Sequence, residues 1–315
     1  MRPRTLLVAG AAALGALLAA RVVRRYQRER RLQAAQLRAQ SEVVDTACGR
    51  MEYASVGDGP RLLFAHGAMG GYDHSLLVAR LIRGFQVIAP SRPGHLRTPL
   101  ATGRTPAEQA DAYAALLDAL HIPQIAMIGG SGGGPSALQF ALRHPDRCWA
   151  LVMVCAVCLP PPASIMRRYR FWAALMRSDF LMWAFTHLTF DTLLAFDSIA
   201  PAVRARLERD DGVMDIVRGL LLIHLSESRR AGLVNDLAQT KTALPICGLE
   251  RLTQPTLIIH GAADLIAPFP NAEYLARAIP GATLLAVEGA GHLCIATHRE
   301  ITIPPLEEFL RRHAP

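Results

Sequence analysis

The sequence has little of what marks the specialised protein classes. Its 315 residues include only 21 prolines and 24 glycines, too few for a collagen-like or low-complexity disordered chain. Charged residues make up 19% of the chain and apolar residues 51%. No internal repeat is evident. This composition excludes a fibrous or disordered protein and predicts one globular domain with an appendage.

The chain also lacks the patterns of nucleic-acid binding. A net charge of +8 would suit a polyanionic partner, but no zinc-finger, RNA-binding or helix-turn-helix pattern is present. Much of the positive charge lies in one arginine-rich run between Arg21 and Arg38, directly after an apolar segment. We interpret this run as a stretch that flanks a membrane segment, and we expect no nucleic-acid partner.

The six cysteines are few and scattered. Cys155 and Cys158 have the spacing of a metal-binding pair, but no second such pair and no matching histidines complete a zinc site. The surrounding sequence VMVCAVCLP is typical of a buried strand that runs into a loop. We therefore predict buried, reduced thiols, with no metal and no cofactor.

The N-terminal segment Thr5–Ala20 carries no charge and is followed by arginines. We predict that residues 1–41 form a membrane anchor and a basic helical stalk, because the run is marginally long enough to span a bilayer. The arginines would keep the rest of the chain in the cytoplasm, which makes the protein a single-pass membrane protein. A cleaved signal peptide with export, or a helix lying on the membrane surface, remain the alternatives.

Residues 42–315 alternate short apolar strands with amphipathic helices. The expected strands are 50–56, 61–65, 85–89, 125–128, 149–156, 256–260 and 283–287, and the expected helices are 105–121, 135–144, 272–278 and 304–312. Continuous apolar strands of this kind predict an α/β fold with a mostly parallel sheet covered by helices on both faces. The alternation stops near residue 158 and returns near 248. We expect this helical insertion to form a cap over the strand ends.

A glycine-rich turn between a strand and a helix holds the first candidate catalytic residue. Gly129-Gly130-Ser131-Gly132-Gly133 follows the G-x-S-x-G pattern, which places a serine on a sharp turn with its hydroxyl exposed. No lysine follows as in a phosphate-binding loop, and no acidic residue marks a dinucleotide site. We therefore predict that Ser131 is a nucleophile.

A serine nucleophile needs a base, and the base needs an acid that orients it. Asp264 and His292 each lie just past a later strand, and His292 follows Gly291 in a loop. We predict His292 as the general base and Asp264 as the acid. The alternatives are an aspartate that only forms a turn and a histidine that only stabilises its loop.

An oxyanion needs two backbone donors. We expect one from Gly132, directly after the nucleophile, and the other from Ala68 in the loop His66-Gly67-Ala68-Met69, with Met69 as the alternative. His66 is interpreted as a structural residue that shapes this loop, and the same holds for His260.

At these residues the chain resembles the α/β-hydrolase superfamily over about residues 45–312. The resemblance rests on the His66-Gly67 loop, the turn at Ser131 and the chain order Ser131, Asp264, His292. Ser91 stands where the family often has an aspartate. The resemblance implies an α/β-hydrolase fold with a helical cap, and a serine hydrolase that works through a Ser-His-Asp triad and an acyl-enzyme.

The apolar start of the cap favours an apolar substrate. Trp172, Phe180 and Trp183 are candidates for the wall of a pocket, although they could equally form the core of the cap. We expect a carboxylic-ester hydrolase acting on an apolar small-molecule or lipid-like ester. The alternatives are a C–C bond hydrolase, a perhydrolase or a peptidase with the same triad, or a non-catalytic binding protein of this fold. A serine at position 131 argues against dehalogenases and epoxide hydrolases, which need an aspartate there.

Overall fold

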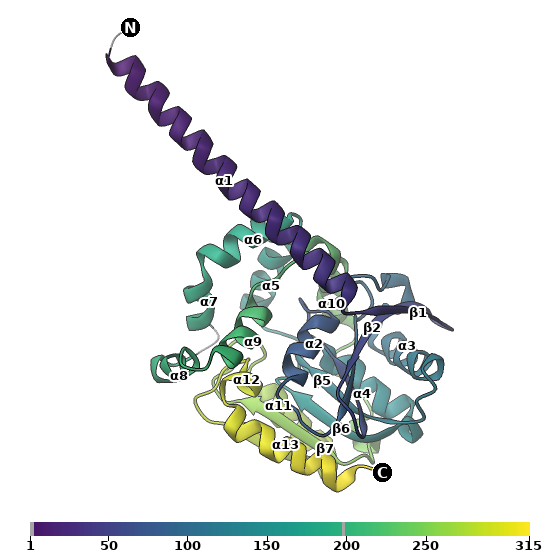
Figure 1. Ribbon diagram of the computed structural model, residues 1–315. Helices are drawn as coiled ribbons and strands as arrows, with labels where there is room; N and C mark the ends of the chain where they lie inside the picture. Colours follow the sequence, from purple (N-terminus) through teal and green to yellow (C-terminus); the bar gives the residue numbers. More distant parts are fainter. Residues whose placement is uncertain (1–2, 197–198) are drawn as a thin grey trace. The chain divides into compact units, whose positions relative to one another are not determined.

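The computed structural model describes residues 3–196 and 199–315, with side chains from residue 13 to 194 and from 199 onward. The described chain divides into two compact units, of which the first ends at Gln40 and the second is Ser41–Pro315. The first unit is a single helix, α1 (Pro3–Ala39), drawn in purple in Figure 1. The second unit holds the sheet and every other helix described below.

The predicted membrane anchor is wrong. Among the described residues, none of the helices is apolar over enough of its length to cross a membrane. In α1 the described side chains are uncharged only from Ala13 to Ala20, and arginines recur from Arg21 onward. A span needs about 20 consecutive apolar residues. The predictions of a single-pass topology, a membrane partner and a cytoplasmic location depended on this anchor and are wrong with it. The side chains of residues 5–12, which belong to the predicted span, lie outside the described residues.

The second unit is built on one sheet of eight strands in the order β1-β2-β4-β3-β5-β6-β7-β8. The strands from β3 onward pair in parallel, and β1 and β2 join one edge antiparallel. This confirms the predicted α/β class. The strands are β1 (Glu42–Thr46), β2 (Gly49–Val56), β3 (Arg61–Ala65), β4 (Gln86–Pro90), β5 (Ile125–Gly130), β6 (Cys148–Val154), β7 (Thr256–Gly261) and β8 (Thr283–Val287).

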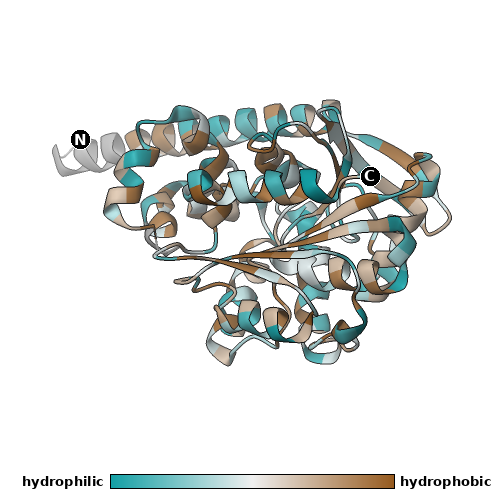
Figure 2. Ribbon diagram, turned by 90° about the horizontal axis from the view of Figure 1, so that it is seen from below, coloured by the Kyte–Doolittle hydropathy of each residue, from teal (hydrophilic) through white to brown (hydrophobic). Residues whose placement is uncertain are grey.

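Successive strand residues point to opposite faces of the sheet and enter two separate cores. In β3, Leu63 belongs to one core, whereas Leu62 and Phe64 belong to the other. Figure 2 shows the sheet edge-on, with largely hydrophobic strands between two layers of helices. The helices that flank the sheet are α2 (Tyr72–Ala79), α3 (Pro106–Ala119), α4 (Gly134–Arg143), α11 (Pro270–Ala278), α12 (Cys294–Thr297) and α13 (Arg299–His313). The sequence did not predict α2 or the edge strand β1.

A helical insertion separates β6 from β7 within the second unit. In Figure 1 its helices α6 to α8 run along one side of the sheet, away from α3. The helices are α5 (Ala163–Leu175), α6 (Asp179–Leu188), α7 (Phe190–Phe196), α8 (Pro201–Leu207), α9 (Asp211–Leu221) and α10 (Glu227–Thr242).

Two buried ion pairs hold α10 against the loop after β4 and against α2. In the first pair α10 supplies the carboxylate, and in the second it supplies the arginine. Arg92, from the loop after β4, contacts the carboxylate of Asp236 on α10 at 2.6 and 3.0 Å. Arg229, on α10, contacts the carboxylate of Asp73 on α2 at 2.8 and 2.9 Å. Both arginines are buried, so each carries its charge out of water only because a carboxylate faces it.

The backbones of α10 and of the loop after β4 also touch. The amide of Gly232 donates to the carbonyl of Gly94 at 2.8 Å. A Cβ on Gly232 would lie 1.9 Å from the ring of His95, which is itself buried. Only glycine permits this approach at position 232.

We expect Gly232→Ala to lower the free energy of unfolding by about 1–3 kcal/mol, because a buried ring would have to move to admit one methyl group. Gly212→Ala is the matched control, since a Cβ there has only the Asp210 carboxylate nearby, at an ordinary 3.5 Å. Urea unfolding of both variants measures the difference. Equal stability of the two variants would contradict the close packing described here.

Candidate active site

The three residues predicted to act together follow the carboxyl ends of neighbouring parallel strands. Ser131 comes directly after β5, Asp264 lies three residues past β7, and His292 lies in the loop after β8. Because parallel strands end at the same edge of the sheet, these loops meet there. The structure brings the three side chains into direct contact.

Ser131 sits on a strained turn between β5 and α4. Its φ angle of +49° lies in the left-handed region, which non-glycine residues rarely adopt. The neighbouring glycines allow the turn to pack: a Cβ on Gly129 would lie 2.6 Å from that of Ala137, and one on Gly133 would lie 2.3 Å from the carbonyl oxygen of Ala65. The pattern G-x-S-x-G is thus a steric requirement of this turn.

A row of two hydrogen bonds joins the three side chains. His292 Nε2 lies 2.9 Å from Ser131 Oγ, and His292 Nδ1 lies 2.7 Å from Asp264 Oδ2. Since a carboxylate only accepts, Nδ1 carries a proton and donates it to Asp264. Nε2 of a neutral ring is then the acceptor for the Ser131 hydroxyl.

Asp264 is held as an anion. Burial alone would raise its pKa, but the electrostatic interaction with His292 and hydrogen bonds from His260 and His292 outweigh burial and keep the pKa well below its usual range. The other carboxylate oxygen accepts from the backbone amides of Ile266 and Ala267 at 2.7 and 2.9 Å. The carboxylate is therefore fixed in position as well as in charge.

The loops that carry Asp264 and His292 are tied to each other. The amide of Ala263 donates to the carbonyl of Ala290 at 2.9 Å, and the amide of Ala262 donates to Val287 at 3.0 Å. A Cβ on Gly261 would lie 2.2 Å from the carbonyl oxygen of Gly291. The distance between acid and base is thus set by backbone contacts.

The residues predicted as oxyanion donors lie together beside Ser131. A Cβ built on Gly132 would be 3.1 Å from the backbone nitrogen of Ala68, so the two residues adjoin. The carbonyl of Ala68 accepts from His95 Nε2 at 2.9 Å. That bond fixes the peptide group shared by Ala68 and Met69, and with it the loop. Burial, followed by the charge of Arg92, lowers the pKa of His95 to about 3, which keeps the ring neutral.

His66 and His260 hold loops in place. His66 Nε2 accepts from the amide of Arg92 at 2.8 Å, so its Nδ1 carries the proton and donates to the carbonyl of Gly67 at 2.7 Å. Burial, with the charges of His95 and Arg92, lowers the pKa of His66 well below its usual value. His260 Nε2 lies 2.7 Å from the carbonyl of Ala267, next to Asp264.

A cavity of about 200 Å³ opens at Ser131 and His292. Its walls come from the loop after β3, from α2, and from α5, α7 and α9 of the insertion. Apolar side chains predominate, among them Val78, Ile165 and Leu220. Trp172, one of the three residues predicted for the wall of a pocket, lines this cavity.

Phe180 and Trp183 lie elsewhere in the insertion. Their rings stack on each other at 6.0 Å between centroids, and Trp183 also faces His187 at 4.8 Å. Neither lines either of the two cavities described for this protein. Tyr169 and Ile266, which the sequence did not single out, line both cavities. No spacing pattern marks them, because one comes from the insertion and the other from the loop after β7.

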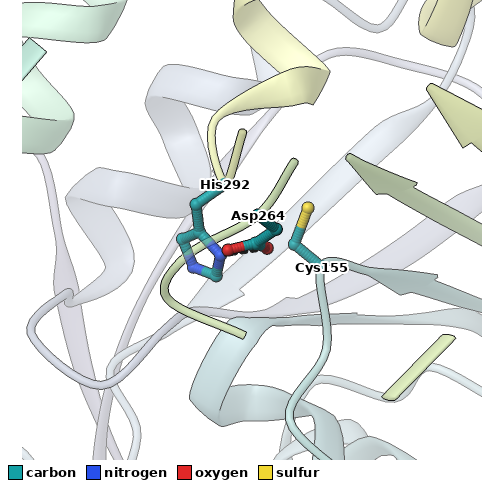
Figure 3. A group of neighbouring side chains, drawn as sticks. All are labelled: Cys155, Asp264 and His292. Atoms are coloured by element: carbon teal, nitrogen blue, oxygen red, sulfur yellow. Dashed lines mark hydrogen bonds and ion pairs between the residues drawn. The ribbon is translucent and has the colours of Figure 1, made fainter. Parts of the chain in front are cut away.

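Cys155 lies beside Asp264 and His292, as Figure 3 shows, and these three offer the geometry of a possible metal site. A hydrogen bond with Cys294 and burial raise the pKa of Cys155 well above its usual value. The thiol is thus a weak ligand and a weak nucleophile. Since His292 and Asp264 are also joined directly at 2.7 Å, the arrangement suits proton transfer better than metal binding.

Comparison with known proteins places the chain in a family. The sequence pattern of the alpha/beta hydrolase fold matches residues 60–298. The chain therefore belongs to the alpha/beta hydrolase family, and it is a hydrolase.

Two curated relatives and one solved structure are similar over most of the chain. A pimeloyl-[acyl-carrier protein] methyl ester esterase of Aromatoleum aromaticum is 31% identical, covering 80% of this chain and 98% of its own. A 2-hydroxymuconate semialdehyde hydrolase of Pseudomonas putida is 30% identical, covering 71% and 76%. An alpha/beta hydrolase fold protein from Nakamurella multipartita has a TM-score of 0.72 at 30% identity, covering 86% and 99%.

We expect the rate of hydrolysis to decrease as the pH is lowered, and we expect this decrease to follow the protonation of one group, His292. A protonated ring cannot accept the Ser131 proton. The low pKa of Asp264 keeps this carboxylate charged from about pH 5 to 8, so it adds no second step. A plot of log kcat/KM against pH should therefore rise with a slope of about one. A slope of two, or a flat profile over this range, would contradict this assignment.

Proposed function

We propose that this protein is a serine carboxylic-ester hydrolase in which Ser131 is the nucleophile, His292 the general base and Asp264 its orienting acid. The observation that carries the proposal is the hydrogen-bonded row from Ser131 Oγ through His292 to Asp264, at the edge of an apolar cavity. An isolated serine hydroxyl is a poor nucleophile, and such a row supplies both its proton acceptor and the acceptor's orientation.

In the proposed acylation step, Ser131 Oγ attacks the ester carbonyl carbon while its proton passes to His292 Nε2. The carbonyl oxygen becomes an anion, which the backbone amides of Ala68 and Gly132 stabilise. The tetrahedral intermediate collapses, and His292 returns the proton to the departing alcohol. Asp264 stabilises the protonated ring throughout and keeps its own charge.

In the proposed deacylation step, a water molecule replaces the alcohol. His292 takes a proton from this water, whose oxygen attacks the acyl carbon bound to Ser131. The same two amides hold the second oxyanion. Collapse releases the carboxylic acid, and His292 returns its proton to Ser131 Oγ.

The substrate class follows from the walls of the cavity. Residues 158–248 supply much of its lining, and we propose that they act as the cap that closes the site over the substrate. Apolar side chains surround the reacting atoms, so an apolar small-molecule ester fits better than a charged one. The similarity to a methyl ester esterase supports ester hydrolysis.

A C–C bond hydrolase is the second candidate. The similarity to a 2-hydroxymuconate semialdehyde hydrolase favours it, because the same three residues would serve that reaction. A panel of simple esters separates the two functions. Turnover of plain alkanoate esters supports the first, and turnover confined to enol-ketone substrates supports the second.

Ser131→Ala should abolish hydrolysis and covalent labelling by a fluorophosphonate. The expected loss in kcat is on the order of 10³-fold or more, since no other group provides the nucleophile. Circular dichroism shows whether the fold is kept, and Ser55→Ala is the control, because this serine is exposed on β2 and lines neither cavity. Undiminished labelling of the folded Ser131→Ala variant would refute the assignment.

Trp172→Ala should change the preference among esters of graded alcohol chain length, because this ring lines the cavity at Ser131 and His292, and His292 gives its proton to the departing alcohol. The control is Trp183→Ala, which removes the same side chain from a position outside the cavity. We expect Trp183→Ala to change stability but not the ranking of chain lengths. Ester panels on both variants decide, and the opposite pattern would place the substrate pocket at Trp183.

A further inference from the structure

We propose that a second cavity beside Ser131 binds a neutral hydrogen-bonding group, a hydroxyl or a carboxamide, carried at the end of the acyl chain. This inference rests on the proposed ester hydrolysis and goes on to define the substrate. The group is recognised by the side-chain amide of Gln109 and by the carboxylate of Asp236, which both contact Arg92 and line this cavity. The substrate would thus have one arm in each cavity and its ester carbonyl between them.

The second cavity adjoins the first at the oxyanion donors. It has a volume of about 200 Å³ and is lined by Ala68 and Gly132, the two residues whose amides would face the carbonyl oxygen. Ala68, Tyr169 and Ile266 line both cavities and form the boundary between them. Since His292 lines only the first cavity, the alcohol that takes its proton lies there, which leaves the second cavity for the acyl chain.

Gln109, on α3, presents an unused donor to this cavity. The residue is 2% exposed, and its oxygen Oε1 lies 3.3 Å from Nη2 and 3.4 Å from Nε of Arg92. Because those arginine nitrogens only donate, Oε1 and not Nε2 faces Arg92, which fixes the orientation of the amide. Within the residues that the structure describes, no acceptor is recorded for Nε2, and Gln109 lines the second cavity.

The charges at this end of the cavity cancel. Arg92 and Asp236 form a close pair, in which each carboxylate oxygen receives one arginine N–H. Asp236 also lines the cavity, and its oxygens keep lone pairs for a further donor. Burial raises the pKa of Asp236 against the charge of Arg92. A carboxylate ligand would face Asp236 with the same charge, so a neutral group with a donor and an acceptor fits best.

The partner of the Gln109 amide could be a group on the substrate or only a water molecule. The enzyme's preference among substrates tells these two cases apart. A buried donor without a partner destabilises the complex, so the enzyme should discriminate against an acyl chain that displaces water from Gln109 without replacing its hydrogen bond. Discrimination between chains that differ only at their end is therefore the relevant measurement.

The experiment measures kcat/KM for p-nitrophenyl esters over a ladder of straight acyl chain lengths. Each length is made with a methyl, a carboxamide and a carboxylate end. We expect the carboxamide ester to exceed the methyl ester by at least about fivefold at one length, the size of one net hydrogen bond. The carboxylate ester should be the poorest of the three at that length.

Gln109→Met should remove the carboxamide preference, because methionine has no N–H donor, and Gln109→Leu is the second variant should the methionine variant not fold. Gln239→Met is the matched control, because Gln239 lines the same cavity on α10. There the ratio of carboxamide to methyl ester should stay within about twofold of wild type.

A wild-type enzyme that hydrolyses plain esters without preference at any length would overturn this inference and leave the ester hydrolase intact. Retained preference in a folded Gln109 variant, or a preference for the carboxylate ester, would also overturn it. If no ester is hydrolysed and no fluorophosphonate is bound, the proposed function itself fails, and this inference fails with it.

Discussion

The left-handed backbone of Ser131 is the constraint on which the site depends. This turn packs so closely against α4 and the end of β3 that neither Gly129 nor Gly133 has room for a side chain. The same turn aims the Ser131 hydroxyl at His292 and brings Gly132 against Ala68. This one turn therefore positions the nucleophile relative to both the base and the oxyanion donors. The packing of the parallel sheet around the turn offsets its backbone strain.

The insertion adds a second level of organisation. The ion pairs Arg92–Asp236 and Arg229–Asp73, together with the contact of Gly94 with Gly232, fix α10 to the sheet. Arg92 has two roles in the interior, because it pairs with Asp236 and also orients the side-chain amide of Gln109. The contacts that hold this cap helix therefore also shape the second cavity, and a change at this junction would affect substrate selection as well as stability.

Much of the fold and of the candidate site could be predicted from sequence because the relevant signals are local. Ser131, Asp264 and His292 each lie within a few residues of the end of an apolar strand, and parallel strands end at one edge. What could not be predicted depends on contacts distant in sequence, such as those of Gln109 and Asp236 with Arg92. The anchor prediction failed because the apolar run beside Arg21 was marginal from the start. In the sequence, Trp172 and Trp183 are both aromatic residues of the helical insertion with no distinguishing pattern. Only the three-dimensional packing shows which of the two lines the cavity at Ser131.

The central claim is that Ser131 forms a covalent acyl-enzyme. It is tested most directly by quenching the enzyme with acid during turnover of a p-nitrophenyl ester, digesting it, and locating the acyl group by peptide mass spectrometry. The account predicts that the added acyl mass lies on the peptide that contains Ser131 and disappears as the substrate is exhausted. An acyl group on another residue, or turnover with no acylated peptide under conditions where deacylation is slowed, would contradict it.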